Sequence, residues 1–212
     1  MSTVLDVKNL SMHYETLAGN VSAVKDVSFS INSGESFGLV GESGCGKTSV
    51  AMTLLQLQPE NSVITEGSIK LDGKELVGLS EYELRKVRWD SISIVFQGAM
   101  NAWNPVIKIG EQIREALREH YPNNSKEENI RKIQELFQMV GLDESTIDRY
   151  PHELSGGMKQ RAVIALALSC DPKIIIADEP TTALDVVIQD QILNEIKNVQ
   201  ELLGLSLIYI SH

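Results

Sequence analysis

Hydrophobic positions divide the chain into short apolar runs and longer stretches of helical character. The short runs are rich in β-branched residues and are either continuous or alternate with polar residues, which predicts strands. They cover residues 23–31, 36–40, 67–71, 91–96, 173–177 and 205–210. The helical stretches cover residues 48–58, 80–88, 108–141, the segment that follows Gly157, and 185–204.

The stretch from 108 to 141 carries no strand pattern. "SKEE" at 125–128 has the spacing of a capping box, and Gly141 is the expected end of the helix that starts there. Four apolar residues of this helix share one face: Ile130, Ile133, Phe137 and Val140. We interpret this helical middle as an insertion into the sheet-forming part of the chain.

The order of strands and helices predicts an α/β fold. Buried strands that alternate with helices imply a parallel sheet covered on both faces. The 212 residues suit one compact domain, or a core with a modest subdomain. The last predicted strand runs to His212, and a buried strand is an unusual terminus, so we expect a truncated form of a longer protein.

Composition narrows the classes of partner. Apolar residues make up 42% of the chain and charged residues 23%, which is ordinary for a soluble globular protein. The formal net charge of −10 argues against nucleic acid as the main partner, because no basic stripe can replace condensed counterions. The chain starts without a secretory signal pattern, and its longest apolar run, 162–168, is too short to span a bilayer. Any membrane role is therefore expected to come through a partner, and Cys45 and Cys170 predict no disulfide framework.

"GESGCGKT" at 41–48, the P-loop, fits the spacing G-x-x-x-x-G-K-[ST] between a predicted buried strand and a predicted helix. Its glycines let successive backbone N–H groups surround a β-phosphate, and Lys47 neutralises the β and γ oxygens. The hydroxyl of Thr48 is a ligand for Mg²⁺. The candidate nucleotide contacts here are Gly41, Glu42, Ser43, Gly44, Cys45, Gly46, Lys47, Thr48 and Ser49.

"IIIADEP" at 174–180 ends a second buried strand with two acidic residues. A carboxylate at this place, Asp178, is costly unless it is paired or close to a metal, so we expect it to anchor the Mg²⁺ held by Thr48. Glu179 is the candidate that orients or deprotonates an attacking water. An acidic pair after a strand usually marks only a helix start. With the P-loop upstream, however, it predicts a nucleotide hydrolase, since phosphoryl transfer needs positioned donors, a divalent ion and an oriented water.

"LSGGMKQR" at 154–161, the LSGG segment, is a second candidate anion site. It leads into a predicted helix, whose free N–H groups and dipole favour negative charge. A second phosphate cradle is redundant for a nucleotide that the P-loop already holds. The spacing alone leaves open whether Ser155, Gly156 and Gly157 face the nucleotide of their own chain or that of another copy.

These motifs, in this order, resemble the ATP-binding subunits of ABC transporters. The order is a P-loop, Gln97 at a strand end, the LSGG segment, "IIIADEP", "TTALD" and a terminal-strand histidine. "VGESGCGKTSVA", "FQGAMNAWNPV" and "DEPTTALDVVIQDQIL" are most similar to the dipeptide and oligopeptide importer branch. The resemblance covers essentially the whole chain and implies a P-loop NTPase (RecA-like) core, an N-terminal antiparallel β subdomain and an inserted helical subdomain. The implied division is 1–98 for the first part of the core, 99–168 for the helical subdomain and 169–212 for the second part of the core.

The resemblance also implies roles for single residues. Tyr14 would stack on adenine, Gln97 would contact Mg²⁺ and the γ-phosphate side, and His212 would contact the γ-phosphate. Asp185 would belong to a loop that couples two nucleotide sites. Without the other motifs, Tyr14 would be read as packing, Gln97 as a strand-end cap and Asp185 as a helix N-cap. Trp103 fits either a docking surface for a membrane subunit or a small core under the helical insertion.

In the family that the chain resembles, the LSGG segment of one subunit closes over the nucleotide of another. Two copies, or this chain and a close paralogue, would clamp two ATP molecules with Mg²⁺, and hydrolysis would reopen the dimer. This cycle would drive two membrane permease subunits. The chain would bind them at the cytoplasmic face of the cell membrane. An extracytoplasmic solute-binding protein would be an indirect partner. The implied catalytic residues are Lys47, Gln97, Glu179 and His212, and the implied Mg²⁺ ligands are Thr48, Gln97 and Asp178. A free carboxylate on His212 would oppose the γ-phosphate, so we expect weak hydrolysis from this 212-residue form.

Three other functions stay open at the level of sequence. An importer of oligosaccharides or metal complexes would share every motif, because the membrane and binding subunits select the cargo. A soluble ABC ATPase acting on ribosomes or DNA usually carries paired cassettes or long insertions, and the acidic charge disfavours it. A nucleotide sensor without hydrolysis is disfavoured by Glu179 and His212.

Overall fold

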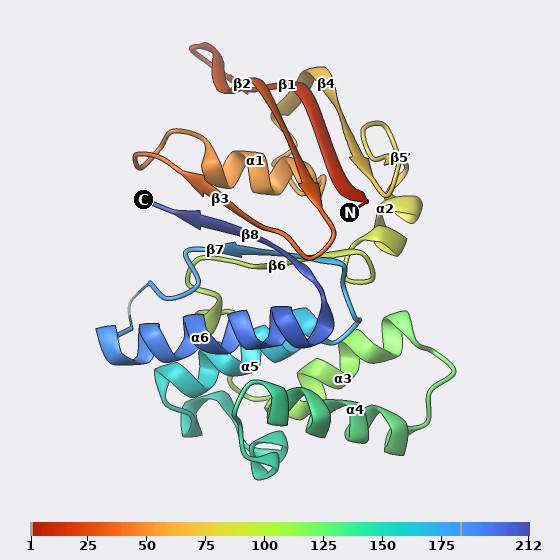
Figure 1. The fold of residues 1–212 in the computed structure, drawn as a ribbon, viewed down its shortest axis with the longest axis vertical. Helices are drawn as coiled ribbons and strands as arrows, with labels where there is room; N and C mark the ends of the chain where they lie inside the picture. Colours follow the sequence, from red (N-terminus) through yellow and green to blue (C-terminus); the bar gives the residue numbers. More distant parts are fainter. Residues whose placement is uncertain (1, 183) are drawn as a thin grey trace.

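The computed structural model describes residues 2–182 and 184–212, which form two sheets and a layer of helices (Figure 1). The first sheet is antiparallel, in the order β2 (Gly19–Asn32), β1 (Thr3–Thr16), β4 (Ser62–Leu71) and β5 (Lys74–Glu75). The second is parallel, in the order β3 (Ser36–Val40), β8 (Ser206–Ser211), β7 (Ile174–Asp178) and β6 (Ile92–Val95). The predicted α/β fold with a parallel core and an antiparallel β part is confirmed.

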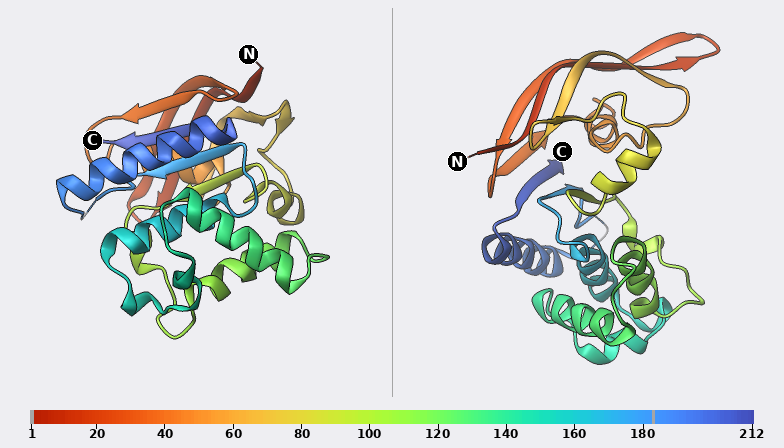
Figure 2. Two further views of the ribbon diagram at one scale, coloured as in Figure 1. Left: turned by 60° about the horizontal axis from the view of Figure 1, so that its bottom comes forward. Right: turned by 90° about the vertical axis from the view of Figure 1, so that its right-hand side faces the viewer.

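Helices lie on both sides of the parallel sheet. Helix α1 lies between the two sheets, α5 and α6 lie against the far face of the parallel sheet, and α3 and α4 lie beyond them, as Figures 1 and 2 show. The α-helices are α1 (Lys47–Leu54), α2 (Glu81–Val87), α3 (Ile109–His120), α4 (Lys126–Met139), α5 (Gly156–Leu168) and α6 (Val186–Leu203). Three short 3-10 turns are η1 (Ala99–Asn101), η2 (Glu144–Asp148) and η3 (Pro151–Glu153).

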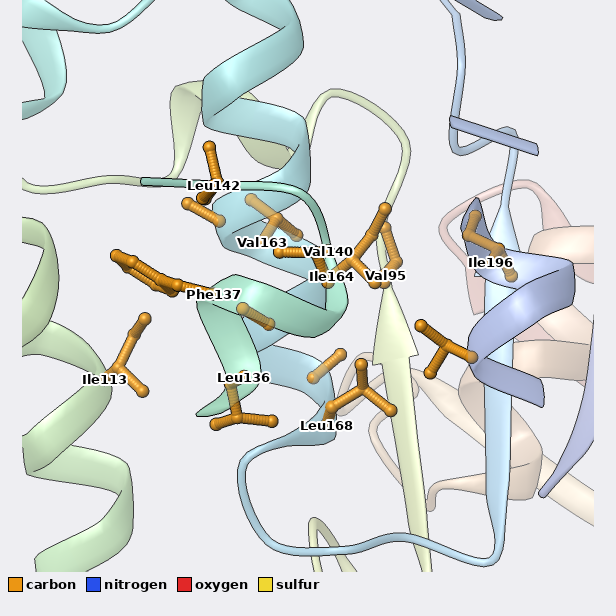
Figure 3. Close-up of a cluster of buried hydrophobic side chains, with 14 of the residues drawn as sticks. Val95, Ile113, Leu136, Phe137, Val140, Leu142, Val163, Ile164, Leu168 and Ile196 are labelled. Carbon is orange, nitrogen blue, oxygen red and sulfur yellow. The ribbon is translucent and has the colours of Figure 1, made fainter. Parts of the chain in front are cut away.

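The alternation of side chains along β7 divides the core into two clusters. Ile174 and Ile176 face one cluster, which α1 and the antiparallel sheet complete. Ile175, between them, faces the second cluster, formed mainly by α3, α4, α5 and α6. Figure 3 shows part of this second cluster, where side chains of α4, α5 and α6 meet near Val95 of β6. The strand is therefore buried on both faces, which explains its continuous apolar run.

Strand β1 is an element that the periodicity did not predict. The buried side chains of Leu5 and Val7 share one phase, and those of Leu10 and Met12 have the opposite phase, because the pairing register shifts between Val7 and Leu10. Asn9, inside the shift, has a φ of 48°, and a Cβ on the facing Gly67 would come within 2.6 Å of the Cα of Leu10. A β-bulge of this kind breaks the two-residue alternation that marks a strand in sequence.

The helical insertion differs in detail from the predicted continuous pattern. The stretch 108–141 contains two helices, α3 and α4, joined by residues 121–125. The capping box of α4 is present, since the amide of Glu128 donates to Ser125 Oγ over 3.1 Å and the Ser125 amide donates back to the Glu128 carboxylate over 2.7 Å. Ile130 is only half-buried, and the fully buried face is completed by Asn129 and Leu136.

Helix α1 is shorter than predicted and ends at Leu54 rather than at Pro59. Gln56 has a φ of 52°, a left-handed conformation that stops the helix. Among residues 2–182 and 184–212, no helix has the length and apolar character of a membrane span. The division of the chain at residues 98 and 168 stays a prediction.

Candidate functional site

The P-loop connects the end of β3 to the start of α1, as its sequence context predicts. Gly44 and Gly46 have φ values of 80° and 96°, which glycine adopts without steric cost. A Cβ on Gly46 would collide with the backbone oxygen of Ala23 in β2. The antiparallel sheet thus fixes the shape of the loop that precedes α1.

Lys47 is the first residue of α1 and is only 9% exposed. Its ammonium donates to the carbonyl oxygens of Gly41 over 2.6 Å and Glu42 over 2.8 Å. The side chain therefore lies across its own loop, and its charge stands at the start of the helix. This charge and the free amides of the helix N-terminus both favour an anion at this position.

Thr48 and Asp178 form the second part of the site. The Thr48 hydroxyl donates to Asp178 Oδ2 over 2.9 Å, although 130 residues separate the two along the chain. Asp178 ends β7 and is 2% exposed; burial raises the pKa of its carboxyl, and the hydrogen bond from Thr48 opposes the shift. In the described part of the chain, no three His, Cys, Asp or Glu side chains group to hold a metal. Mg²⁺ ordinarily binds through a few protein oxygens, substrate phosphates and water, which suits this two-oxygen arrangement.

Glu179 is the point on which three other side chains converge. Gln97 Nε2 lies 2.7 Å and Thr182 Oγ1 3.0 Å from its Oε2, and His212 Nδ1 lies 3.0 Å from its Oε1. The hydrogen bond with His212 lowers the pKa of the Glu179 carboxyl. Glu179 has a φ of 47°, a backbone conformation that costs a non-glycine residue about 1–3 kcal/mol and is typical of functional sites. The structure thus brings the predicted residues Gln97, Glu179 and His212 together.

Thr182 is a neighbour of this group that the sequence reasoning did not select. Its spacing from Glu179 was the available signal, because residues three apart are within reach of each other across a turn. The turn forms here: the amide of Thr182 donates to the Glu179 carbonyl oxygen over 3.2 Å.

Tyr14 lies in β1 beside the helix that follows the P-loop. Its hydroxyl is 3.0 Å from the hydroxyl of Ser49, and the pair is partly buried. The contact joins the antiparallel sheet to α1 close to Lys47 and Thr48. Stacking of Tyr14 on an adenine ring stays a prediction.

The LSGG segment lies apart from the P-loop in this chain. Ser155 is the N-cap of α5 and accepts a hydrogen bond from the Met158 amide over 3.3 Å. A Cβ on Gly156 would meet Leu184 at 3.4 Å, and one on Gly157 would meet Ile188 at 3.0 Å. Figure 1 shows α1 and α5 on opposite sides of the parallel sheet. The structure therefore does not bring the two candidate phosphate cradles together.

Two more candidates have clear positions. Asp185 is the N-cap of α6, where its carboxylate accepts from the Ile188 amide over 3.0 Å. Trp103 is 7% exposed and belongs to the cluster under the helical insertion, and it also lines the groove beside that insertion, so a contact with a membrane subunit stays a prediction. Its indole nitrogen donates to the Lys159 carbonyl oxygen over 3.4 Å.

The chain is similar in sequence to known transport proteins. A family model described as ABC transporter matches residues 24–182. The chain is 45% identical over 211 residues to the dipeptide transport ATP-binding protein DppD of Lactococcus lactis subsp. cremoris, covering 99% of this chain and 60% of that protein. It is 45% identical over 215 residues to the oligopeptide transport ATP-binding protein AppD of Bacillus subtilis, covering 100% of this chain and 65% of that protein. The chain thus spans less than two thirds of the length of these relatives.

Solved structures show the same fold. The dimeric structure of MJ0796, described as a bacterial ABC transporter cassette, matches with a TM-score of 0.86 at 32% identity, covering 98% of this chain and 88% of that one. MJ0796 in a post-hydrolysis state bound to ADP and Pi matches with the same values. The predicted resemblance to the dipeptide and oligopeptide branch is confirmed by 43–45% identity over nearly the whole chain. On these matches and on its arrangement of sheets and helices, the chain belongs to the ABC transporter family.

Proposed function

We propose that this chain binds and hydrolyses ATP and that the reaction powers an importer of dipeptides or oligopeptides. The observation that carries the proposal is the position of Glu179. It lies next to the Thr48–Asp178 pair, and donors from the ends of β6 and β8 orient it. The names of the similar peptide transport proteins support the cargo class, and the post-hydrolysis state of MJ0796 supports the reaction.

In this proposal, the P-loop binds the triphosphate. Lys47 would exchange its contacts with loop carbonyl oxygens for the β- and γ-phosphate oxygens, and the amides at the start of α1 would donate to the β-phosphate. Thr48, Gln97 and Asp178 are the residues that would hold Mg²⁺, which neutralises charge on the phosphates when bound. The further contacts proposed around the loop are Tyr14, Gly41, Glu42, Ser43, Gly44, Cys45, Gly46 and Ser49.

Glu179 and His212 serve the hydrolytic step. The oxygen of a water molecule forms a bond to the γ-phosphorus, and the bond from that phosphorus to the bridging oxygen breaks. ADP leaves with the electron pair, and the proton of the water passes to the Glu179 carboxylate. His212 would donate to the γ-phosphate, and its hydrogen bond to Glu179 in this structure keeps the two side chains close.

A second subunit completes the site in this proposal. Ser155 and Gly156 are exposed at the start of α5, away from the P-loop of their own chain. A second copy or a close paralogue would place its own Ser155, Gly156 and Gly157 over the γ-phosphate, with Asp185 in the loop between the two sites. The dimeric state of MJ0796 supports this arrangement.

The transporter would include two membrane permease subunits, with a solute-binding protein as an indirect partner, on the cytoplasmic face of the membrane. A groove of about 630 Å³ between β6 and the helical insertion offers an apolar contact surface, and it includes Phe96, Ile107 and Leu166. Copurification with membrane subunits rather than with nucleic acid would distinguish a transporter from a soluble ATPase.

Substitution Glu179→Gln tests the proposal. The amide keeps the shape of the side chain but takes up no proton, so turnover should fall about 10²- to 10⁴-fold while ATP binding persists. An ATP-dependent dimer should then accumulate, measurable by size-exclusion chromatography. Glu135→Gln on the exposed side of α4 is the control and should behave as the wild type. Wild-type turnover in the Glu179→Gln variant would reject the role of Glu179.

A further inference from the structure

Among the residues that the structure describes, three side chains contact the Glu179 carboxylate, and the proposed function gives a task to Gln97 and His212 but none to Thr182. Its hydroxyl and the amide of Gln97 donate to the same oxygen, Oε2, over 3.0 and 2.7 Å. His212 occupies the other oxygen, Oε1, at 3.0 Å. A carboxylate accepts about four hydrogen bonds, so three of its positions are taken before any water arrives.

We propose that Thr182 is a positioning residue that holds Glu179 in its hydrolytic orientation once Gln97 and His212 have turned to the nucleotide. The inference rests on the proposed function, which assigns Gln97 to Mg²⁺ and His212 to the γ-phosphate. When those two side chains move, Oε1 becomes free to accept from water. Oε2 then keeps only the hydrogen bond from Thr182.

The contact from Thr182 is local, whereas the other two connect distant segments. Gln97 is 82 residues from Glu179 along the chain and His212 is 33 residues away, so both depend on how separate strands end. Thr182 is three residues away, and its amide donates to the Glu179 carbonyl oxygen over 3.2 Å. Thr182 therefore moves together with Glu179. The Thr182 hydroxyl stays within hydrogen-bond reach of the Glu179 carboxylate when the site rearranges.

Glu179 needs such a support for two reasons. Its φ of 47° is a strained conformation that the surroundings must hold in place. Its side chain is still 17% exposed, so packing alone does not fix the carboxylate. A catalytic group that is misplaced by about 1 Å loses about 10²-fold in rate, so a single orienting hydrogen bond has a measurable effect.

The test compares Thr182→Val, which keeps the branched shape without the hydroxyl, with Thr182→Ser, which keeps the hydroxyl. In the Val variant we expect kcat to fall about 10-fold, with KM and the calorimetric ATP affinity within about twofold of the wild type. The Ser variant should restore most of the rate. Because hydrolysis reopens the dimer, the lifetime of the ATP-bound dimer should lengthen about 10-fold in the Val variant. This lifetime is a readout separate from turnover.

Thr65→Val is the matched control, since Thr65 is an exposed threonine whose hydroxyl donates to the Ser11 carbonyl oxygen over 3.2 Å in β4. It should leave kcat and dimer lifetime unchanged. Wild-type kcat in Thr182→Val would overturn this role alone, as would a loss of ATP affinity that matches the loss of rate. A wild-type protein that neither binds nor hydrolyses ATP would instead overturn the proposed function, and this role with it.

Discussion

The P-loop and the LSGG segment are both glycine-containing starts of helices, but their surroundings differ. Around the P-loop, Lys47, Thr48 and Asp178 contact partners within the same chain and place charged groups close together. Around the LSGG segment, the side chains nearest to Gly156 and Gly157 are apolar ones, including Leu184 and Ile188, and Ser155 is exposed.

The difference indicates that the two regions do different work with the same helix chemistry. A helix N-terminus attracts an anion through its free amides, but a bound phosphate also needs cations to neutralise it. The P-loop has its cation in Lys47, whereas the LSGG segment starts a helix that packs on α6 and the helical insertion, and the cation of its Arg161 is paired with Glu195 of α6. In the proposed dimer, the first region binds nucleotide alone, and the second acts only on a nucleotide already held by another copy.

Of the changes that compare the two regions, a substitution in the P-loop should have the largest effect, and it should act on ATP affinity. Lys47→Ala removes the only side-chain cation that we assign to the triphosphate, so ATP affinity should fall about 100-fold in calorimetry. Lys173→Ala is a suitable control, because Lys173 forms an exposed ion pair with Asp72 and such pairs contribute little. Unchanged affinity in Lys47→Ala would remove the distinction between the two regions.

A substitution in the LSGG segment should have a smaller effect, and it should act on dimer formation rather than on the ATP affinity of the monomer. Ser155→Ala removes the N-cap of α5, which costs about 1 kcal/mol of stability, together with the hydroxyl proposed to meet a second copy's nucleotide. ATP affinity of the monomer should stay at the wild-type value, while the ATP-dependent dimer should weaken about 10-fold in analytical ultracentrifugation.

Ser125→Ala separates the two consequences of that change. Ser125 is the N-cap of α4 in the same helical insertion, so its loss should cost a similar amount of stability without weakening the dimer. If both variants weaken the dimer equally, the LSGG segment has only a structural role. If Ser155→Ala lowers the affinity of the monomer for ATP, the two regions share one nucleotide after all.

The sequence predicts the P-loop side better than its surroundings. A buried apolar run, glycines at fixed spacing and a helix are local signals, so β3, the loop and α1 follow from residues 36–54 alone. The acidic end of β7 follows in the same way, because a continuous apolar run ends in Asp178 and Glu179. Both segments meet because the carboxyl ends of parallel strands lie at one edge of a sheet.

Other features depend on backbone geometry that residue patterns do not show. The bulge at Asn9 hides β1 by shifting its apolar phase, and the left-handed Gln56 shortens α1. Gln97, Thr182 and His212 contact the carboxylate of Glu179, whose backbone has a φ of 47°, and no sequence motif predicts that value. The side to which Trp103 turns depends on how the insertion packs against α5, which sequence alone left undecided.

The smallest expected effect tests the hydrogen bond between Tyr14 and Ser49, which connects the antiparallel sheet to the nucleotide side of α1. Tyr14→Phe and Ser49→Ala each remove this 3.0 Å contact while the aromatic ring or the helix remains. A neutral hydrogen bond contributes about 0.5–1.5 kcal/mol, so each variant should lose about threefold in ATP affinity. Because both variants lose the same bond, the double variant should lose about as much as either alone, and the double-mutant cycle should show a coupling of about 0.6 kcal/mol. If the two losses are additive, each hydroxyl affects ATP binding separately. The hydrogen bond between Tyr14 and Ser49 would then not be the cause of the losses.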